Sequence, residues 1–271
     1  MKKIILLVTA IIIIMALVFT GCSAAKQTTE PAAEVKQENL LDKIKAEGVM
    51  KIGTEGTYAP FTFHDKDGKL TGFDVEIAEE VAKRLGVKAE FIETKWDGMF
   101  AGLDAKRFDA VANQVTIRPD RIEKYDFSDS YIVSKAVLIV GAENNEIKSF
   151  TDLKGKKSGQ SLTSNLADIA KLNGADLVQV DGFNQALDLL NSKRIDATIN
   201  DSLSYLDYKT QRPDAPIKVA AELDTKDESG ILFNKGNQEL VDAVNKSLAD
   251  MKADGTYLKI SQKWFSEDVS K

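Results

Sequence analysis

Cysteine and histidine are nearly absent from this 271-residue sequence, which contains one residue of each type. The single cysteine excludes a disulfide bond within the chain. His64 has no second histidine and no cysteine as partner, so it supports neither a zinc site nor a Ser-His-Asp triad, and we expect a solvated loop residue. The G-x-G-x-x-G and P-loop patterns are also missing, and no nucleophile is placed beside a base. We therefore expect no cofactor, no metal and no catalytic residue.

A basic excess is missing too, because 36 lysines and arginines stand against 42 aspartates and glutamates, for a formal net charge of −6. This balance argues against a nucleic-acid partner, which requires a basic face. The 43% hydrophobic and 29% charged content is that of a globular protein. At 271 residues the chain is long enough for two cores of ordinary domain size.

Only one long hydrophobic run is present, at residues 4–19, and it is too short to span a membrane comfortably. It follows the basic segment Met1-Lys2-Lys3 and leads to Gly21-Cys22, an arrangement that resembles the processing site of a bacterial lipoprotein. We expect residues 1–21 to be a lipoprotein signal peptide, Cys22 to be lipidated (with palmitate), and residues 22–38 to be a flexible tether. A free thiol after an ordinary cleavage site and an uncleaved anchor are the alternatives.

The chain contains an internal repeat, at residues 106–114 and again at residues 193–201. Each copy follows an apolar helical pattern and gives a basic pair, an apolar residue, Asp-Ala, a short apolar run, then Asn and a second polar residue. A strand that ends on polar residues after a helix delivers side chains to the carboxyl end of an α/β sheet, where ligands bind. The repeat therefore predicts two related lobes that aim polar groups at one place.

Helical and strand patterns alternate along the rest of the chain, which predicts an α/β fold. We place two crossings between the lobes, near Val133 and near Asp227, so that lobe 1 comprises residues 39–133 and 228–271 and lobe 2 comprises residues 134–227. The last two helices are expected to return and cover lobe 1. Local expectations include a loop at residues 54–61, a loop at Trp96-Asp97, and one strand over residues 229–233.

Charged residues follow both copies of the repeat. Arg118 and Arg121 come in the first turn after the first copy, where a guanidinium can grip a carboxylate with two parallel hydrogen bonds; solvated surface charges are the alternative. Asp201 ends the second copy and suits an ammonium group, or else it caps the helix that follows, and one carboxylate can serve both.

Two further groups of residues favour ligand contact. Thr163-Ser164-Asn165 precedes a helix, whose free N–H groups attract an anion, although ordinary capping is the alternative. Tyr58, Phe61 and Trp96 lie outside periodic faces, so they suit the aromatic walls of a pocket better than a core. Glu55 is then expected to meet a positive group at the far end of the ligand.

Several separated motifs, covering nearly everything from Leu40 onward, resemble the polar amino acid-binding proteins of ABC importers. The motifs are Glu55-Gly56-Thr57-Tyr58-Ala59-Pro60-Phe61, Gly72-Phe73-Asp74, Trp96-Asp97, residues 109–121, Phe127-Ser128-Asp129 and residues 196–201. The resemblance implies a two-lobed periplasmic-binding-protein type II fold, with a hinge of two crossing segments, that closes on one amino acid.

The resemblance also assigns roles to the ends of the amino acid. It implies that Arg121 holds the α-carboxylate, helped by Thr116 and by the helix start at Ser164-Asn165. It implies that Asp201 takes the α-amino group, with the backbone of Gln114 assisting.

The side chain of the amino acid is implied to lie between Tyr58 and Trp96. Glu55 stands where Asp is common, and Asn113-Gln114 replaces the Ser-Ser pair of the basic amino acid binders, which argues against lysine or arginine. Other stretches, including residues 160–165 and 263–271, are most similar to Gram-positive cystine-binding lipoproteins. L-Cystine, or a related sulfur amino acid, is therefore the first expected ligand.

The implied function is amino-acid transport by a non-catalytic, monomeric, lipid-anchored receptor on the extracellular face of the cell membrane. It would deliver its ligand to an ABC permease and the associated ATPase subunits. Binding of glutamine, arginine or histidine is an alternative. A cyclohexadienyl dehydratase-like enzyme on the same fold is another, and Glu55 is its only obvious general acid.

Overall fold

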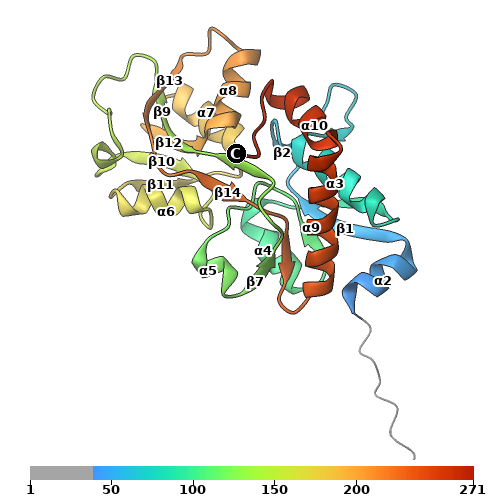
Figure 1. The fold of residues 1–271 in the computed structure, drawn as a ribbon. Helices are drawn as coiled ribbons and strands as arrows, with labels where there is room; N and C mark the ends of the chain where they lie inside the picture. Colours follow the sequence, from blue (N-terminus) through green and yellow to red (C-terminus); the bar gives the residue numbers. More distant parts are fainter. Residues whose placement is uncertain (1–38) are drawn as a thin grey trace, which may run out of the picture. The chain divides into compact units, whose positions relative to one another are not determined.

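The computed structural model describes residues 39–271, and two five-stranded sheets form its frame (Figure 1). The predicted signal peptide, the tether and Cys22 lie outside the described residues. Within the described part of the chain, every helix is too short or too polar to cross a membrane.

The first sheet has the strand order β5-β1-β6-β15-β7. Its central strand β1 (Val49–Thr54) is parallel to β5 (Lys88–Glu93) and to β6 (Ala110–Val111). The strand β15 (Leu232–Asn234) is antiparallel to both β6 and β7 (Tyr125–Phe127). The parallel strands end together at one edge, as the repeat predicts.

The second sheet repeats this arrangement with the order β11-β10-β12-β9-β13. Here β10 (Lys157–Gln160) is parallel to β11 (Asp176–Gln179) and β12 (Ala197–Asp201). The buried strand β9 (Ala136–Gly141) is antiparallel to β12 and to the edge strand β13 (Ile217–Glu222). The two copies of the sequence repeat thus occupy equivalent places in two similar sheets.

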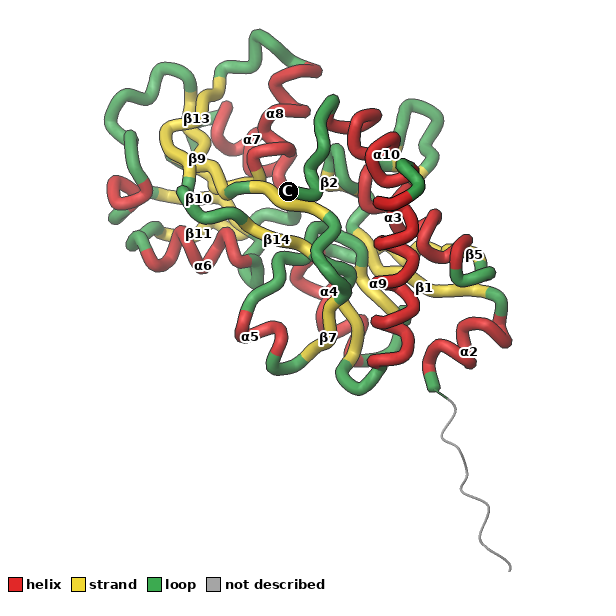
Figure 2. The backbone as a smooth tube through the Cα atoms, in the orientation of Figure 1, coloured by secondary structure: helices red, strands yellow, loops and turns green. Residues whose placement is uncertain are grey.

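Two segments connect the sheets, and they pair with each other as the antiparallel strands β8 (Ile132–Ser134) and β14 (Asp227–Ser229) (Figure 2). The expected single strand over residues 229–233 is wrong. The chain leaves β8 after Ser229, and Gly230 and Ile231 lead it into β15 of the first sheet. The backbone N–H of Gly230 donates to Val115 O at 3.1 Å, so the break is held in place.

Helices cover both sheets. In the first half of the fold, which contains the first sheet, these are α2 (Leu40–Glu47), α3 (Phe73–Arg84), α4 (Trp96–Asp104), α5 (Pro119–Ile122), α9 (Gln238–Ala253) and α10 (Thr256–Phe265). The small sheet of β2 (Thr57–Tyr58), β3 (Thr62–His64) and β4 (Leu70–Thr71) belongs to the same half. The second half contains the second sheet with η1 (Phe150–Leu153), α6 (Asn165–Leu172), α7 (Phe183–Asn191) and α8 (Ser202–Gln211). Residues of α9 and α10 share one core with α3 and β1, so the terminal helices do return to the first sheet.

The basic pair of the repeat has a structural origin. Lys106 and Lys193 both adopt left-handed backbone conformations, with φ of 56° and 57°, directly after α4 and α7. The next residues, Arg107 and Arg194, each donate a backbone N–H at 2.9 Å to a carbonyl five residues earlier. This is the Schellman pattern, which ends a helix by satisfying its free carbonyls.

The repeated aspartate also serves the fold. Asp109 Oδ2 accepts the backbone N–H of Lys51 at 2.8 Å, and Asp196 Oδ2 accepts that of Lys157 at 2.7 Å. Each carboxylate therefore fastens the repeat strand to its neighbour. Only the polar residues at the far end of the strands are left to serve a ligand.

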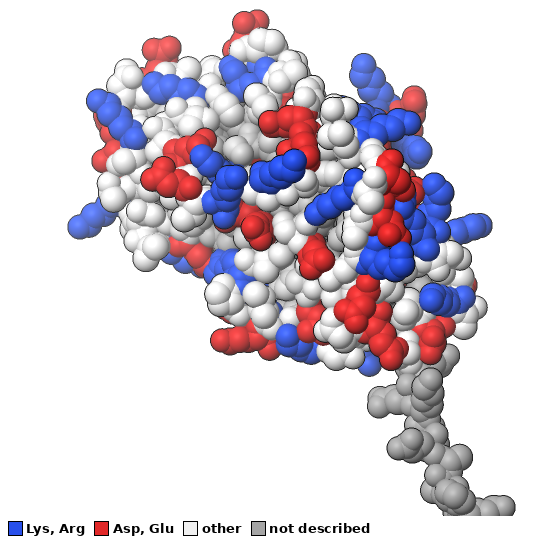
Figure 3. All heavy atoms as spheres, viewed as in Figure 1, with Lys and Arg blue, Asp and Glu red and all other residues white. Residues whose placement is uncertain are grey.

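The expected loop at Trp96-Asp97 is wrong, because these two residues form the first turn of α4 with Lys95 as N-cap. Asp97 suits that position, since an acidic side chain is favoured in the first turn of a helix. On the face shown in Figure 3, acidic and basic side chains are interspersed, so this face offers no broad basic surface to a nucleic acid.

Candidate functional site

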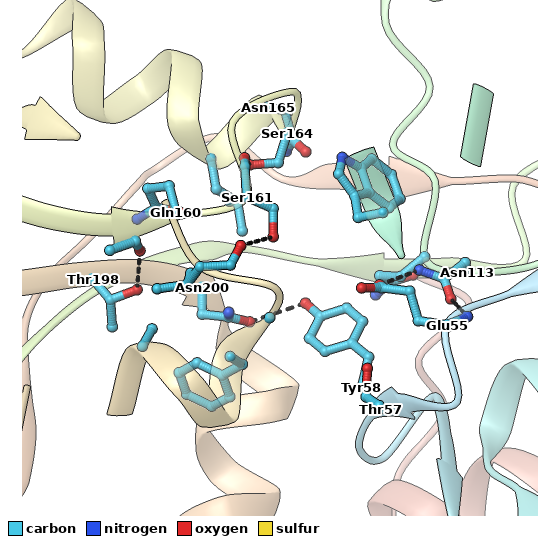
Figure 4. Close-up of a pocket in the computed structure, with 18 residues that line it drawn as sticks. Glu55, Thr57, Tyr58, Asn113, Gln160, Ser161, Ser164, Asn165, Thr198 and Asn200 are labelled. Atoms are coloured by element: carbon cyan, nitrogen blue, oxygen red, sulfur yellow. Dashed lines mark hydrogen bonds between the residues drawn. The ribbon is translucent and has the colours of Figure 1, made fainter. Parts of the chain in front are cut away.

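A cavity lies between the two halves of the fold, and both contribute to its walls (Figure 4). Its only charged residue among those described is Glu55. The lining residues are Glu55, Thr57, Tyr58, Trp96, Asn113 and Gln114 from the first half, and Gly159, Gln160, Ser161, Ser164, Asn165, Leu166, Val180, Gly182, Phe183, Ala186, Thr198 and Asn200 from the second.

Glu55 and Asn113 hold each other at the end of β1. Asn113 Nδ2 donates to Glu55 Oε2 at 2.7 Å, and the backbone N–H of Glu55 donates to Asn113 Oδ1 at 2.7 Å. Burial raises the pKa of Glu55 to about 7, although the hydrogen bond from Asn113 works in the opposite direction. A cationic group in the cavity would stabilise this carboxylate in its charged form.

Two aromatic side chains of the first half, Tyr58 and Trp96, form part of the wall. Tyr58 reaches across the cavity, where its hydroxyl donates to Asn200 Oδ1 at 2.9 Å (Figure 4). Trp96 packs edge-on against Phe100, with ring centroids 5.6 Å apart. The expectation for Phe61 is wrong, because its ring is fully buried in the core of the first half and touches the cavity only through Tyr58.

Gln114 carries the site's most unusual backbone conformation. Its φ is 51°, in the left-handed region that non-glycine residues rarely adopt. Its backbone N–H donates to Asp74 Oδ2 at 2.6 Å, and its side-chain Nε2 donates to Asp201 Oδ2 at 3.3 Å. Asp74 is fully buried in the first turn of α3, and burial raises its pKa to about 7. A buried carboxylate thus fixes the strained backbone beside the cavity.

Asp201 is engaged by the protein itself. Its Oδ1 accepts the backbone N–H of Leu203 at 2.8 Å, which caps α8, and its Oδ2 also accepts the hydroxyl of Ser134. Burial raises the pKa of Asp201 to about 6. The capping alternative is therefore realised, and Asp201 lies behind the cavity lining rather than on it.

Arg121 is buried in α5, next to the cavity wall. Its Nη1 donates to Thr116 O at 2.9 Å, and its guanidinium carbon lies 5.5 Å from the ring centroid of Trp96 and 5.3 Å from that of Phe100. Burial, reinforced by the positive charge of Arg118, lowers the pKa of Arg121 to about 10. Among the described residues, no carboxylate lies within 4.0 Å of this guanidinium.

Of the residues at the start of α6, two line the cavity and one lies at its rim. Ser164 and Asn165 line the cavity, and Ser164 Oγ also accepts the backbone N–H of Ala167 at 3.0 Å as the cap. Thr163 does not line it. Its backbone N–H and its hydroxyl both donate to Asp97 Oδ1, at 3.1 and 2.8 Å, across the opening between the halves.

The structure thus brings most of the expected residues to one cavity. Those on the lining are Glu55, Tyr58, Trp96, Asn113, Gln114, Ser164 and Asn165; those outside it are Thr116, Arg121, Thr163 and Asp201. Their roles toward a ligand stay a prediction.

Gln160, Phe183 and Asn200 line the cavity but were not expected there. Asn200 had a usable signal, since it occupies the same place in the second repeat as Asn113 in the first. Gln160 ends β10, so its position at the carboxyl end of a strand was a weaker signal. Phe183 begins α7 within an apolar helical pattern, and nothing in that pattern separates it from a core residue.

Further contacts join the two halves along the rim of the cavity. Lys95 Nζ lies 2.7 Å from Asp181 Oδ2, and Arg118 Nη1 lies 3.1 Å from Asp168 Oδ2. Asp97 completes this set through Thr163. We call these the rim contacts. They are direct, so the halves stand closed against each other in this structure.

Sequence comparison identifies related proteins over nearly the whole chain. The profile of the bacterial extracellular solute-binding proteins, family 3, matches residues 50–267. The L-cystine-binding protein TcyA of Bacillus subtilis (strain 168) is 50% identical over 272 residues, covering 100% of both chains.

Two solved structures bear on the arrangement of the halves. An ancestral arginine-binding protein bound to arginine is 41% identical, covers 80% of this chain and 98% of its own, and has a TM-score of 0.76. The L-cystine solute receptor of Neisseria gonorrhoeae, in its unliganded open conformation, is 50% identical over 85% of this chain and 98% of its own. Although its sequence is more similar, its TM-score is lower, at 0.57. A rigid-body displacement of one half relative to the other, between an open and a closed form, would lower the score in this way. The expected two-lobed type II periplasmic-binding fold is confirmed.

Proposed function

The chain belongs to family 3 of the bacterial extracellular solute-binding proteins, and we propose that it is the receptor of an ABC importer for L-cystine or a related sulfur amino acid. The observation that carries this proposal is the 50% identity to the cystine-binding TcyA, which extends over the full length of both chains. The cavity agrees with it, because a mainly uncharged wall with one buried carboxylate suits a polar, double-ended amino acid.

We propose that Arg121 binds the α-carboxylate together with Thr116 and the helix start at Ser164 and Asn165. A buried guanidinium with no carboxylate partner among the described residues is costly, and a ligand carboxylate would relieve that cost. Arg121 lies against Trp96, which itself lines the cavity, so a small rearrangement of the wall would expose it to the ligand.

The ammonium groups are proposed to meet carboxylates at two places. Asp201 takes the α-ammonium with help from Gln114, and Glu55 takes the ammonium at the far end of cystine. Tyr58 and Trp96 enclose the chain of atoms between the two ends. Thr163 is proposed to act through its contact with Asp97, and so to favour the closed state rather than to touch the ligand.

We propose a binding protein without enzymatic activity. A dehydratase would need a general acid beside a leaving group. Glu55 has a pKa near neutrality, which suits an acid, but it is held by Asn113, and the described lining offers no second carboxylate, histidine or lysine beside it. Glutamine, arginine and histidine remain alternative ligands, because Glu55 would accept any of their polar side chains.

Family membership implies a location outside the cytoplasm. We further propose a monomer that is lipid-anchored to the cell membrane through Cys22 after removal of residues 1–21. Residues 22–38 would tether lobe 1 (residues 39–133 and 228–271) and lobe 2 (residues 134–227), and the closed form would dock on the permease. Metabolic labelling with a fatty acid, lost in Cys22→Ser, tests the anchor.

Thermal unfolding against a panel of amino acids tests the function. A ligand present at a hundred times its dissociation constant adds about 2.7 kcal/mol to the free energy of unfolding. We expect that shift with L-cystine and its loss in Arg121→Ala. A shift with glutamine, arginine or histidine alone would keep the receptor and overturn the specificity. No shift with any amino acid, together with turnover of prephenate or arogenate, would establish the enzyme instead.

A further inference from the structure

Cystine has one charged group that the site described so far does not match. It carries two carboxylates and two ammonium groups, and the proposed roles of Arg121, Asp201 and Glu55 account for three of these four. Glu55 is the only charged residue among the described residues of the cavity lining, so no cation stands there for the second carboxylate. The two α-carbons of a disulfide are roughly 4.4–6.8 Å apart, so the second end must occupy a separate place.

A second cavity adjoins the first and shares two of its lining residues. Thr57 and Phe183 line both cavities, so they form the boundary between them. The second cavity lies between the first half at β2 and β3 and the second half at α7 and α8. Its further lining includes His64, Asp207, Tyr208 and Arg212.

Three side chains pack in a row, from Phe183 at the boundary to the guanidinium of Arg212 in the second cavity. The ring of Phe183 packs edge-on against Tyr208, with centroids 6.1 Å apart. The guanidinium carbon of Arg212 lies over the Tyr208 ring, 4.8 Å from its centroid. Stacking of this kind holds a guanidinium in place while leaving its N–H groups free for a carboxylate.

Arg212 is available for such a bond. Among the described residues, no carboxylate lies within 4.0 Å of its guanidinium. Asp207 lines the same cavity, but its Oδ2 accepts Gln211 Nε2 at 2.8 Å. The second cavity therefore presents an exposed guanidinium, oriented by Tyr208, beyond the boundary formed by Thr57 and Phe183.

We propose that this second cavity is the subsite for the second carboxylate of a double-ended amino acid, with Arg212 as its partner. The inference rests on the proposed function, because it concerns the far end of a cystine-like ligand. It makes Arg212 a specificity residue that distinguishes cystine from amino acids with a single carboxylate.

Calorimetric titration of the full chain with two ligands tests the subsite. The ligands are L-cystine and the mixed disulfide of L-cysteine with cysteamine, which lacks only the second carboxylate. The variant is Arg212→Gln, and the matched control is Arg194→Gln, which removes another exposed arginine of the second half that lines neither cavity. Unchanged thermal unfolding without ligand shows that both variants are folded.

We expect Arg212→Gln to weaken L-cystine binding about tenfold and to leave the mixed disulfide unchanged, while Arg194→Gln changes neither. Equal effects on both ligands, or no effect on L-cystine, would overturn the subsite while the proposed function stands. Failure of the unaltered protein to bind L-cystine at all would overturn both.

Discussion

Three carboxylates near the cleft have pKa values that are raised mainly by burial: about 7 for Glu55, about 7 for Asp74 and about 6 for Asp201. Each of these carboxylates accepts hydrogen bonds from neighbouring donors. Among the described residues, no lysine, arginine or histidine nitrogen lies within 4.0 Å of any of them. Such groups favour the protonated state in the folded protein, and a ligand ammonium would reverse that preference.

The stability of the ligand-free protein should therefore depend on pH. Because the folded pKa values lie above the unfolded ones, the stability these groups contribute is present below pH 4 and is lost as the pH rises through 6 to 7. Urea denaturation should give a higher midpoint at pH 5 than at pH 8. Glu55→Gln should reduce this difference, and an unchanged difference in that variant would show that Glu55 does not titrate in this range.

Asp74 should matter because it holds the backbone of Gln114. In Asp74→Ala the buried N–H of Gln114 loses its acceptor, which should lower the free energy of unfolding by roughly 1–3 kcal/mol. Asp74→Asn keeps an acceptor oxygen in the same place and should recover much of the loss. Chemical denaturation measures both variants. Equal losses of unfolding free energy in the two variants would indicate that the charge of Asp74, and not its hydrogen bond, stabilises the fold.

For single residues, the sequence indicated which side chains lie near the cavity better than it indicated their hydrogen-bond partners. The polar ends of both repeats led to Asn113, Gln114 and Asp201. That Asp201 would cap α8 and lie behind the lining depends on the distant Ser134 and Gln114, which no local pattern reveals. Phe61 was misjudged because its burial comes from other elements packing over a loop, while sequence periodicity reports only an element's own faces.

Among the elements, both copies of the repeated helix–strand unit pack an apolar side chain against a glycine of the neighbouring strand. Phe108 and Ile195, the apolar residues after each basic pair, pack against Gly53 and Gly159, each the next-to-last residue of the neighbouring strand. A methyl group on Gly53 would lie 2.6 Å from the ring of Phe108, and one on Gly159 would lie 2.8 Å from Cδ1 of Ile195. Both strands thus need glycine, but to different degrees.

Gly53→Ala should destabilise the protein more than Gly159→Ala. A buried ring cannot move aside, so the first change should cost roughly 1–3 kcal/mol of unfolding free energy. The end of an isoleucine side chain can rotate away, so the second should cost about 1 kcal/mol or less. Urea denaturation of the two variants provides the comparison. A larger loss for Gly159→Ala would contradict this view of the packing.

The rim contacts should slow ligand release without choosing the ligand. Asp97→Ala removes the acceptor of Thr163 and should speed release about three- to tenfold, equally for every amino acid that binds. Thr163→Val removes only the hydroxyl bond and keeps the backbone N–H bond to Asp97, so it should speed release less than Asp97→Ala does. The double variant should be little worse than Asp97→Ala alone, as expected for partners in one contact. Stopped-flow release measures all three. Strictly additive effects would mean that the two residues act separately.

The order of the elements was largely predictable from sequence, because apolar periodicity and glycine or proline punctuation mark them locally. Gly48 ends α2 in a left-handed conformation and Pro119 begins α5, as their positions suggest. The break between β14 and β15 was not predictable. It arises because the chain changes partner from β8 to the first sheet, and no local pattern in residues 229–233 marks that change.

For the molecule as a whole, two similar α/β halves are joined by the paired strands β8 and β14 and close over a cavity that both halves line. The cavity lining comes from both halves, so only the closed arrangement completes it. A ligand that binds both halves therefore shifts the population toward closure. Which amino acid does so depends on the detailed shape of the cavity and on charges such as those of Glu55 and Arg212.

Calorimetric titration of the purified protein with L-cystine distinguishes a cystine receptor from a receptor for another amino acid. We expect one binding site per chain and a higher affinity for L-cystine than for glutamine, arginine or histidine measured in the same way. Tight binding of one of those amino acids with no heat from L-cystine would contradict this expectation.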